Sequence, residues 1–191
     1  SAFSRTDIAR LGATKAQVFL YLGGLGDTLE AATANLSALS ALRVPTVFVP
    51  GGSDRLELVD DAFGELEGEA ADFVVHGSGL RELWLNKERF AVLPGAAMGR
   101  YAADERSCGY QQADLDALEE ALGKSKARTW LLSWNAPAGW GVSSAGNMDV
   151  GSPELSKLAK AIGARGGIFA YPAVQALSAG QEPQAGGLAL V

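Results

Sequence analysis

Few residues in this chain of 191 are suited to catalysis, and several of them lie in glycine-rich turns. Asp27 follows residues 23–26, which include three glycines, and Asp54 follows Gly51-Gly52-Ser53. Carboxylates in such turns could hold a hard cation such as Mg²⁺ or Ca²⁺, and the glycines could cradle a phosphate at a helix start. A tight strand-to-helix turn with an aspartate cap is the simpler interpretation, because neither a P-loop ending nor a complete Gly-x-Gly-x-x-Gly is present.

Imidazole and thiol groups occur once each, as His76 and Cys108. His76 follows an apolar run and has no Cys, Asp or Glu at ligand spacing, which predicts a surface or structural role. A single cysteine excludes an internal disulfide and a thiolate metal cluster. Arg106 could lower the pKa of the Cys108 thiol. With one histidine in the chain, however, we expect a free cysteine on a loop.

Composition limits the class of protein. Hydrophobic residues make up 48% of the chain, the net charge is −6, and no run of Lys or Arg occurs. This length suits one packed domain, which we place at residues 1–178. The acidic charge argues against nucleic acid as a partner. No apolar segment approaches the ~20 residues needed to span a bilayer, so we expect a soluble piece with no membrane span.

The two ends indicate a fragment. The chain begins at Ser1 without a methionine and ends in Leu188-Ala189-Leu190-Val191, the pattern of a beginning strand. Residues 179–191 are predicted to be a surface connection and the start of a final strand that continues beyond the fragment. We expect a trimmed or processed protein, which leaves its location open between the cytoplasm and export after loss of an N-terminal signal or anchor.

Apolar runs alternate with helical patterns, which predicts an α/β domain. Asp27 or Thr28 is placed to cap the first of these helices, and Ser152 with Pro153 begins the last. Close runs at residues 73–75, 83–85 and 90–93 have the spacing of an antiparallel meander in a second sheet. The other expected strands lie at residues 18–22, 46–49, 129–133 and 167–170, and the helices at 29–42, 56–66, 114–122 and 153–162.

The order of these elements resembles the calcineurin-like metallophosphoesterases over almost the whole chain. The likeness is carried by the strand ends Leu22 to Asp27, Val49 to Asp54, Phe90 to Gly95, Leu132 to Pro137 and Gly167 to Pro172. The resemblance implies an α/β fold of two packed mixed β-sheets, a β-sandwich, flanked by helices as four layers, α/β/β/α. It also implies that Asp, Asn and His residues at the strand ends hold two metal ions and hydrolyse phosphoric esters.

The residues that this resemblance aligns with metal ligands are mostly of the wrong type. Gly24 stands for the bridging aspartate unless Asp27 replaces it, and Trp134 stands for a lone histidine. The first motif would fall near Ser4-Arg5-Thr6, which contains neither Asp nor His. The positions of this degenerate site are Gly24, Asp27, Gly52, Ser53, Asp54, Trp134, Asn135, Tyr171 and Ala173.

Our leading hypothesis is a catalytically inactive metallophosphoesterase-like protein, a pseudoenzyme, that acts as a scaffold or interaction module for an unknown protein partner. Hydrolysis needs two metal ions that clamp the phosphoryl oxygens and lower the pKa of a bound water from ~15.7 towards neutrality. Glycine, serine, tryptophan and tyrosine cannot replace their ligands, so we expect no catalytic residue, metal or other cofactor. The rings of Trp134, Trp140 and Tyr171 are expected to fill the former site.

Two alternatives remain open. In one, the degenerate cleft binds a small phosphorylated, nucleotide or sugar ligand through Asp27, Asp54, Trp134, Asn135 and Tyr171, because aromatic rings bind planar faces. In the other, weaker alternative, the protein is a metal-dependent phosphoesterase with nonstandard ligands, with a single divalent cation at Asp27 and Asp54.

Overall fold

A computed structural model describes residues 3–66, 68–98, 106–123, 127–145, 148–171 and 187–190. The expected positions Ala173 and Val191, and the connection at residues 179–186, lie outside these ranges. No helix in the described ranges is long and apolar enough to cross a membrane.

The first sheet consists of three parallel strands in the order β1 (Phe19–Leu22), β2 (Thr46–Val49) and β3 (Val74–His76). Its crossover connections are α2 (Leu29–Ser40) and α3 (Leu56–Gly64), the latter followed by the 3-10 helix η1 (Gly68–Phe73). Parallel neighbours require such crossovers, because a tight turn can join only antiparallel strands. Thr28, not Asp27, caps α2 by accepting a hydrogen bond from the Ala31 amide.

The second sheet is mixed, in the order β12-β11-β8-β5-β4. Its central strands β5 (Glu88–Leu93), β8 (Thr129–Asn135) and β11 (Ala164–Tyr171) are parallel. The edge strands β4 (Glu82–Leu85) and β12 (Gly187–Leu190) are antiparallel to their neighbours. The helices α4 (Gln112–Leu122) and α5 (Pro153–Ala161) lie on one face of this sheet. Short pairs complete the described strands, namely β6 (Ala96–Ala97) with β7 (Gly109–Tyr110) and β9 (Ser144–Ala145) with β10 (Met148–Asp149).

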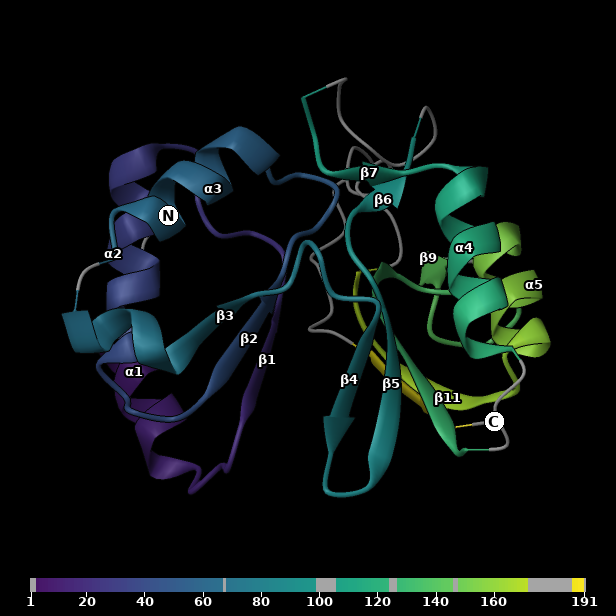
Figure 1. The fold of residues 1–191 in the computed structure, drawn as a ribbon, viewed down its shortest axis with the longest axis horizontal. Helices are drawn as coiled ribbons and strands as arrows, with labels where there is room; N and C mark the ends of the chain where they lie inside the picture. The colour runs from purple at the N-terminus through teal and green to yellow at the C-terminus, as the bar shows by residue number, and fades with distance from the viewer. Residues whose placement is uncertain are drawn as a thin grey trace.

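The two sheets face each other across an apolar cluster. Val47 and Val49 of β2 pack in this cluster with Phe90 and Val92 of β5 and Leu132 of β8. Figure 1 shows α1 (Arg5–Ala13), α2 and α3 on the outer side of the first sheet, and α4 and α5 on the far side of the second. Because side chains alternate between the faces of a strand, each sheet contributes one set of residues to the shared cluster and another to its helices. The protein is a mixed α/β structure with no closed barrel among the described strands.

Two expectations from the sequence are wrong. The predicted meander is divided between the sheets, because β3 pairs in parallel with β2 and only β4 and β5 form an antiparallel hairpin. Short apolar runs indicate strands but not their partners, and here α3 and η1 return the chain to the first sheet. The segment that the resemblance aligned with a strand-end motif, Ser4-Arg5-Thr6, instead begins α1, where Ser4 forms a capping box with Asp7.

The capping signals of the last helix are confirmed. Ser152 accepts a hydrogen bond from the Leu155 amide, Pro153 occupies the first turn, and Gly163 follows the C-cap with a φ of 63°. A left-handed residue after the C-cap favours glycine, because other residues meet a steric penalty there. The final strand expected from Leu188 is also found, as β12 paired with β11.

Candidate functional site

The carboxyl ends of β1, β2, β5 and β8 meet at one edge of the two sheets. The Gly23 amide donates a hydrogen bond to the Val49 carbonyl at 2.9 Å, which joins the ends of β1 and β2. The Gly95 amide donates to the Pro50 carbonyl at 2.7 Å, which joins the ends of β2 and β5 and therefore the two sheets. In Figure 1 this edge lies beneath β6 and β7.

The indole of Trp134 occupies the space between the strand ends. Trp134 is 6% exposed and projects from β8 towards the first sheet. A Cβ atom added to Gly23 would lie 2.5 Å from its Cδ1 and 2.6 Å from its Nε1, and one added to Gly51 would lie closer still. Such distances are shorter than any real carbon contact, so the ring rests directly on two glycine backbones. Trp134 therefore fills the space between these strand ends.

Asp54 is a buried carboxylate that joins the turns after β1 and β2. It is 3% exposed and accepts hydrogen bonds from the amides of Gly24 at 2.9 Å, Leu25 at 2.8 Å and Gly51 at 2.7 Å. Burial raises the pKa of the Asp54 carboxyl above its ordinary value, and the three amide donors oppose that shift. Its oxygens are thus already engaged within the fold, which gives Asp54 a structural role.

The segment from Ser107 to Tyr110 lies against the same edge. The Cys108 amide donates to the Asp54 carbonyl at 2.7 Å, and the Ala96 amide donates to the Cys108 carbonyl at 3.1 Å. Cys108 is a free cysteine on a loop, as expected from the sequence, and the structure adds that it is buried. Burial, together with the nearby carboxylates of Asp54 and Asp60, raises the pKa of its thiol to about 11. At neutral pH the group is a protonated thiol and a poor nucleophile.

The other predicted residues of the first two loops differ in their placement. Asp27 is exposed, although its negative charge is near enough to contribute to the raised pKa of Asp54. Gly24 is exposed and adopts a φ of 76°, with its amide on Asp54. Gly52 is buried, whereas Ser53 is exposed. The structure therefore brings Gly24 and Asp54 together, while the side chains of Asp27 and Ser53 lie in solvent.

Asn135 lies on the opposite face of β8 from Trp134. Alternation along the strand places Ser133 and Asn135 on the side of Leu131, which packs under α4 and α5. Asn135 is 1% exposed, and in the described part of the chain neither its Oδ1 nor its Nδ2 has a hydrogen-bond partner. The structure thus separates Asn135 from the Trp134 side of the sheet. The backbone of Tyr171 pairs beside Asn135 in β11.

Trp140, expected at the former site, also belongs to the cluster on the helix side. Its ring meets Phe169 edge to face, with centroids 5.9 Å apart and an interplanar angle of 80°. This placement corrects the expectation that Trp140 fills the same volume as Trp134. The sequence around Trp140 did not indicate on which face of the second sheet its ring would pack.

His76 ends β3 and has a structural environment. Its ring stacks on Phe63 with centroids 4.4 Å apart, and its Nδ1 lies 3.5 Å from a carboxylate oxygen of Asp60. Burial lowers the pKa of His76, and the negative charge of Asp60 opposes this shift. These contacts hold the imidazole against α3, on the helix side of the first sheet.

The metal pair implied by the family resemblance does not fit these residues. An apolar indole occupies the space between the strand ends, and the Asp54 carboxylate accepts three amide hydrogens. Within the described ranges, no group of three or more His, Cys, Asp or Glu side chains is arranged to hold a metal ion. Two-metal hydrolysis requires carboxylate and imidazole ligands around both ions.

Sequence reasoning missed three contacts that shape this edge. They are the packing of Trp134 on Gly51, the backbone hydrogen bond from Cys108 to Asp54, and the backbone hydrogen bond from Gly95 to Pro50. All three join residues that are far apart in the sequence, so no local pattern reports them. The glycines themselves were visible, but they read equally well as ordinary turn residues.

Comparisons with known proteins identify structures of similar fold but indicate no chemical activity. No protein-family model and no curated protein matches the chain. One crystal structure superposes with a TM-score of 0.66 and 13% identity, covering 85% of this chain and 76% of the other. The crystal structure of TT1561 of Thermus thermophilus superposes with a TM-score of 0.61 and 17% identity, covering 83% and 71%. At these identities the similarity shows a shared fold alone.

Replacing Gly51 by alanine tests the contact with Trp134. Gly51 has no left-handed φ, so the cost of a Cβ atom there arises from the indole. We expect Gly51→Ala to lower the free energy of unfolding by about 2 kcal/mol or more, and by less than about 1 kcal/mol when Trp134→Ala is also present. Chemical denaturation of the four proteins of this cycle measures the coupling. Gly79→Ala is the control, because nothing lies near its added Cβ, and an additive cycle would contradict the contact.

Replacing Asp54 by asparagine tests its role as a shared acceptor. The amide group cannot accept from all three backbone N–H donors and would turn one of its own donors towards them. We expect Asp54→Asn to lower the free energy of unfolding by about 3 kcal/mol, because buried donors lose their partner. Asp27→Asn, at an exposed carboxylate, should change stability little. Equal stabilities of the two variants in urea would show that Asp54 does not join these turns.

Proposed function

We propose that the protein is a catalytically inactive metallophosphoesterase-like domain, a pseudoenzyme, that acts as a scaffold or interaction module. The observation that carries the proposal is the indole of Trp134, which rests on the backbones of Gly23 and Gly51. These glycines belong to the turns that the resemblance aligns with metal-binding motifs. The ring stabilises the join between the two sheets where an enzyme of that family would need open, charged space.

The fold supports this proposal. Two sheets enclose a shared apolar cluster, and helices cover the outer face of each, which is compatible with a four-layer α/β/β/α arrangement. The strand-end turns that carry the resemblance after β1, β2, β5 and β8 gather at one edge of these sheets. That gathering is what the resemblance implies for the position of the former site.

The chemistry of the edge supports loss of catalysis. A hydrolase must hold a water or another nucleophile in a reactive form beside the phosphorus atom. Here the Asp54 carboxylate is committed to backbone amides, and the Cys108 thiol has a pKa of about 11. The exposed side chains of Asp27 and Ser53 lack an imidazole partner within the loops that carry them. Packing contacts and backbone hydrogen bonds thus engage the residues that the resemblance aligns with metal ligands.

Binding of a small phosphorylated, nucleotide or sugar ligand is the second candidate. Asn135 favours it, because a buried amide without partners among the described residues offers one acceptor and two donors. Its place under α4 and α5 means that such a ligand would enter on the helix side and not over Trp134. The weaker alternative, a phosphoesterase with nonstandard ligands, would have to use Asp27 and Asp54, whose carboxylates are respectively exposed and hydrogen-bonded.

Metal content and phosphodiester hydrolysis test the main proposal. The purified protein, incubated with Mn²⁺ and desalted, is expected to retain substoichiometric metal and to hydrolyse bis(p-nitrophenyl) phosphate no faster than buffer containing Mn²⁺. Two equivalents of tightly bound metal, or turnover that a chelator abolishes, would overturn it. The variant Asp27→Asn/Asp54→Asn separates contamination from activity, since turnover of a contaminating hydrolase would persist in it. Circular dichroism of the variant checks that it is folded.

A thermal-shift screen with nucleotides, sugars and phosphates tests the second candidate. A ligand that binds the folded state raises the midpoint of unfolding as its saturation increases. If Asn135 is the recognition group, the shift should disappear in Asn135→Leu, which keeps the size of the side chain and removes its polar atoms. A shift that persists in this variant places the ligand elsewhere, and no shift with any compound counts against a binding role.

A further inference from the structure

The edge strand β4 presents an unpaired backbone. The Val92 amide donates to the Arg81 carbonyl at 3.0 Å, so these opposite residues form a hydrogen-bonded pair of the antiparallel ladder. Such pairs alternate along a ladder, which assigns the amides and carbonyls of Leu83 and Leu85 to β5. Those of Glu82 and Trp84 consequently point away from the sheet. β4 ends the second sheet, so among the described strands nothing pairs with these groups.

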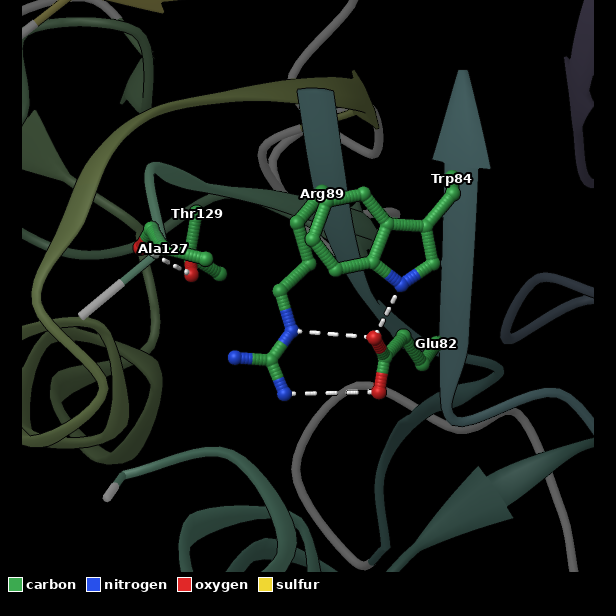
Figure 2. A network of polar contacts seen from close by, with 5 residues as sticks. All are labelled: Glu82, Trp84, Arg89, Ala127 and Thr129. Atoms are coloured by element: carbon green, nitrogen blue, oxygen red, sulfur yellow. Dashed lines mark hydrogen bonds and ion pairs between the residues drawn. The ribbon is translucent and has the colours of Figure 1, made fainter. Parts of the chain in front are cut away.

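An exposed aromatic ring stands on this edge and is held in place. Trp84 is 53% exposed, the most exposed of the large hydrophobic residues described. Its indole nitrogen donates to a carboxylate oxygen of Glu82, as Figure 2 shows. A tryptophan whose orientation is already fixed loses little conformational freedom when a partner covers it. Trp84 therefore has the properties of an anchor residue at an interface.

The charge on the edge is compensated from within. Glu82 receives two hydrogen bonds from Arg89, from Nε at 3.1 Å and from Nη2 at 3.3 Å. Arg89 is itself 5% exposed and faces Trp84 across the hairpin. Charged residues on edge strands commonly prevent pairing with other chains. Here Arg89 offsets part of the Glu82 charge, so this device is weak when the residue that faces Glu82 is neutral.

We propose that β4 is a dimerisation edge that pairs antiparallel with β4 of a second copy of this chain, about a twofold axis at Leu83. In this register Glu82 of each copy lies opposite Trp84 of the other. The outward amides and carbonyls of both residues then find partners, and the two sheets become one continuous sheet. The Leu83 side chains of the two copies meet at a non-hydrogen-bonded pair, where opposite side chains approach most closely.

Other registers that align the outward groups are less favourable. A register centred on Glu82 opposes two like charges, which destabilises a cross-strand pair. One centred on Trp84 places Glu82 against Asn86, which lies beyond the end of β4 and has a φ of 48° in the hairpin turn. The register centred on Leu83 also uses the full four-residue strand. Self-pairing of this edge therefore favours one arrangement, which specifies a closed dimer rather than a fibre.

The expected dimer is weak. Pairing of one four-residue strand with its anchors buries less than the roughly 1,200 Å² typical of stable interfaces.

Dimerisation through β4 is also independent of the strand-end site around Trp134. A monomeric protein would therefore leave the proposed loss of catalysis untouched, and a catalytic protein would leave the dimer untouched.

Sedimentation velocity of the full chain, from about 1 µM to about 1 mM, tests the proposal. The unmodified protein is expected to shift reversibly from monomer to dimer within this range. Trp84→Glu places a glutamate opposite Glu82 of the second copy and should raise the dissociation constant at least about tenfold. Trp84→Lys loses the same ring but faces Glu82 with the opposite charge, so it should weaken dimerisation less, by a margin that shrinks in high salt.

Leu56→Glu is the matched control. It adds the same charge at another exposed large hydrophobic residue, in the first turn of α3, and should leave the dissociation constant unchanged. Thermal unfolding of each variant checks that the hairpin remains folded. A protein that stays monomeric to the highest concentration overturns the proposal. So does a dimer that Trp84→Glu leaves intact, and equal weakening by glutamate and lysine overturns the register.

Discussion

The indole of Trp134 packs against the glycine backbones at positions 23 and 51. The arrangement of the strand ends of both sheets depends on this contact. It joins a strand of the second sheet to the turns after two strands of the first. Any larger residue at either glycine would hold the sheets apart, because close-packed interiors cannot absorb an added atom. The hydrogen bond between Gly95 and Pro50 also links the two sheets at this edge, so apolar and polar contacts together hold the sheets here.

Asp54 is a potentially reactive carboxylate that has a structural role at the join between the turns after β1 and β2. A carboxylate that accepts three backbone amides in a buried position is an efficient way to hold two turns in register. The same engagement leaves it poorly suited to hold a cation or to accept a proton from a substrate. Cys108 follows this pattern, since its backbone takes part in the cover over Asp54 while burial keeps its thiol protonated. In both residues, structural roles account for the burial and the shifted pKa values.

The predictions from sequence succeeded where the signal was local. The caps of the last helix, the glycine-rich turns after β1 and β2 and the final strand are specified by neighbouring residues, and the structure confirms them. Assignments that required a partner were less secure. The run at β3 was recognised as a strand but was placed in the wrong sheet, and Asn135 was grouped with Trp134 although strand alternation puts them on opposite faces. The helix α1 was missed, since it contains few large apolar residues and none of its residues is buried.

The sequence by itself determined the α/β class, most of the strands and helices, and the poverty of metal ligands at the strand ends. These follow from residue type and short-range spacing, which backbone sterics and side-chain chemistry translate directly into local structure. Only the tertiary structure decided that Trp134 packs on Gly23 and Gly51 and that the Asp54 carboxylate accepts hydrogen bonds from backbone amides. It also decided that Trp84 is exposed on an edge strand of the second sheet. Each of these contacts depends on which distant segments come together in the fold. Packing between those segments decides this, and local conformational preference does not.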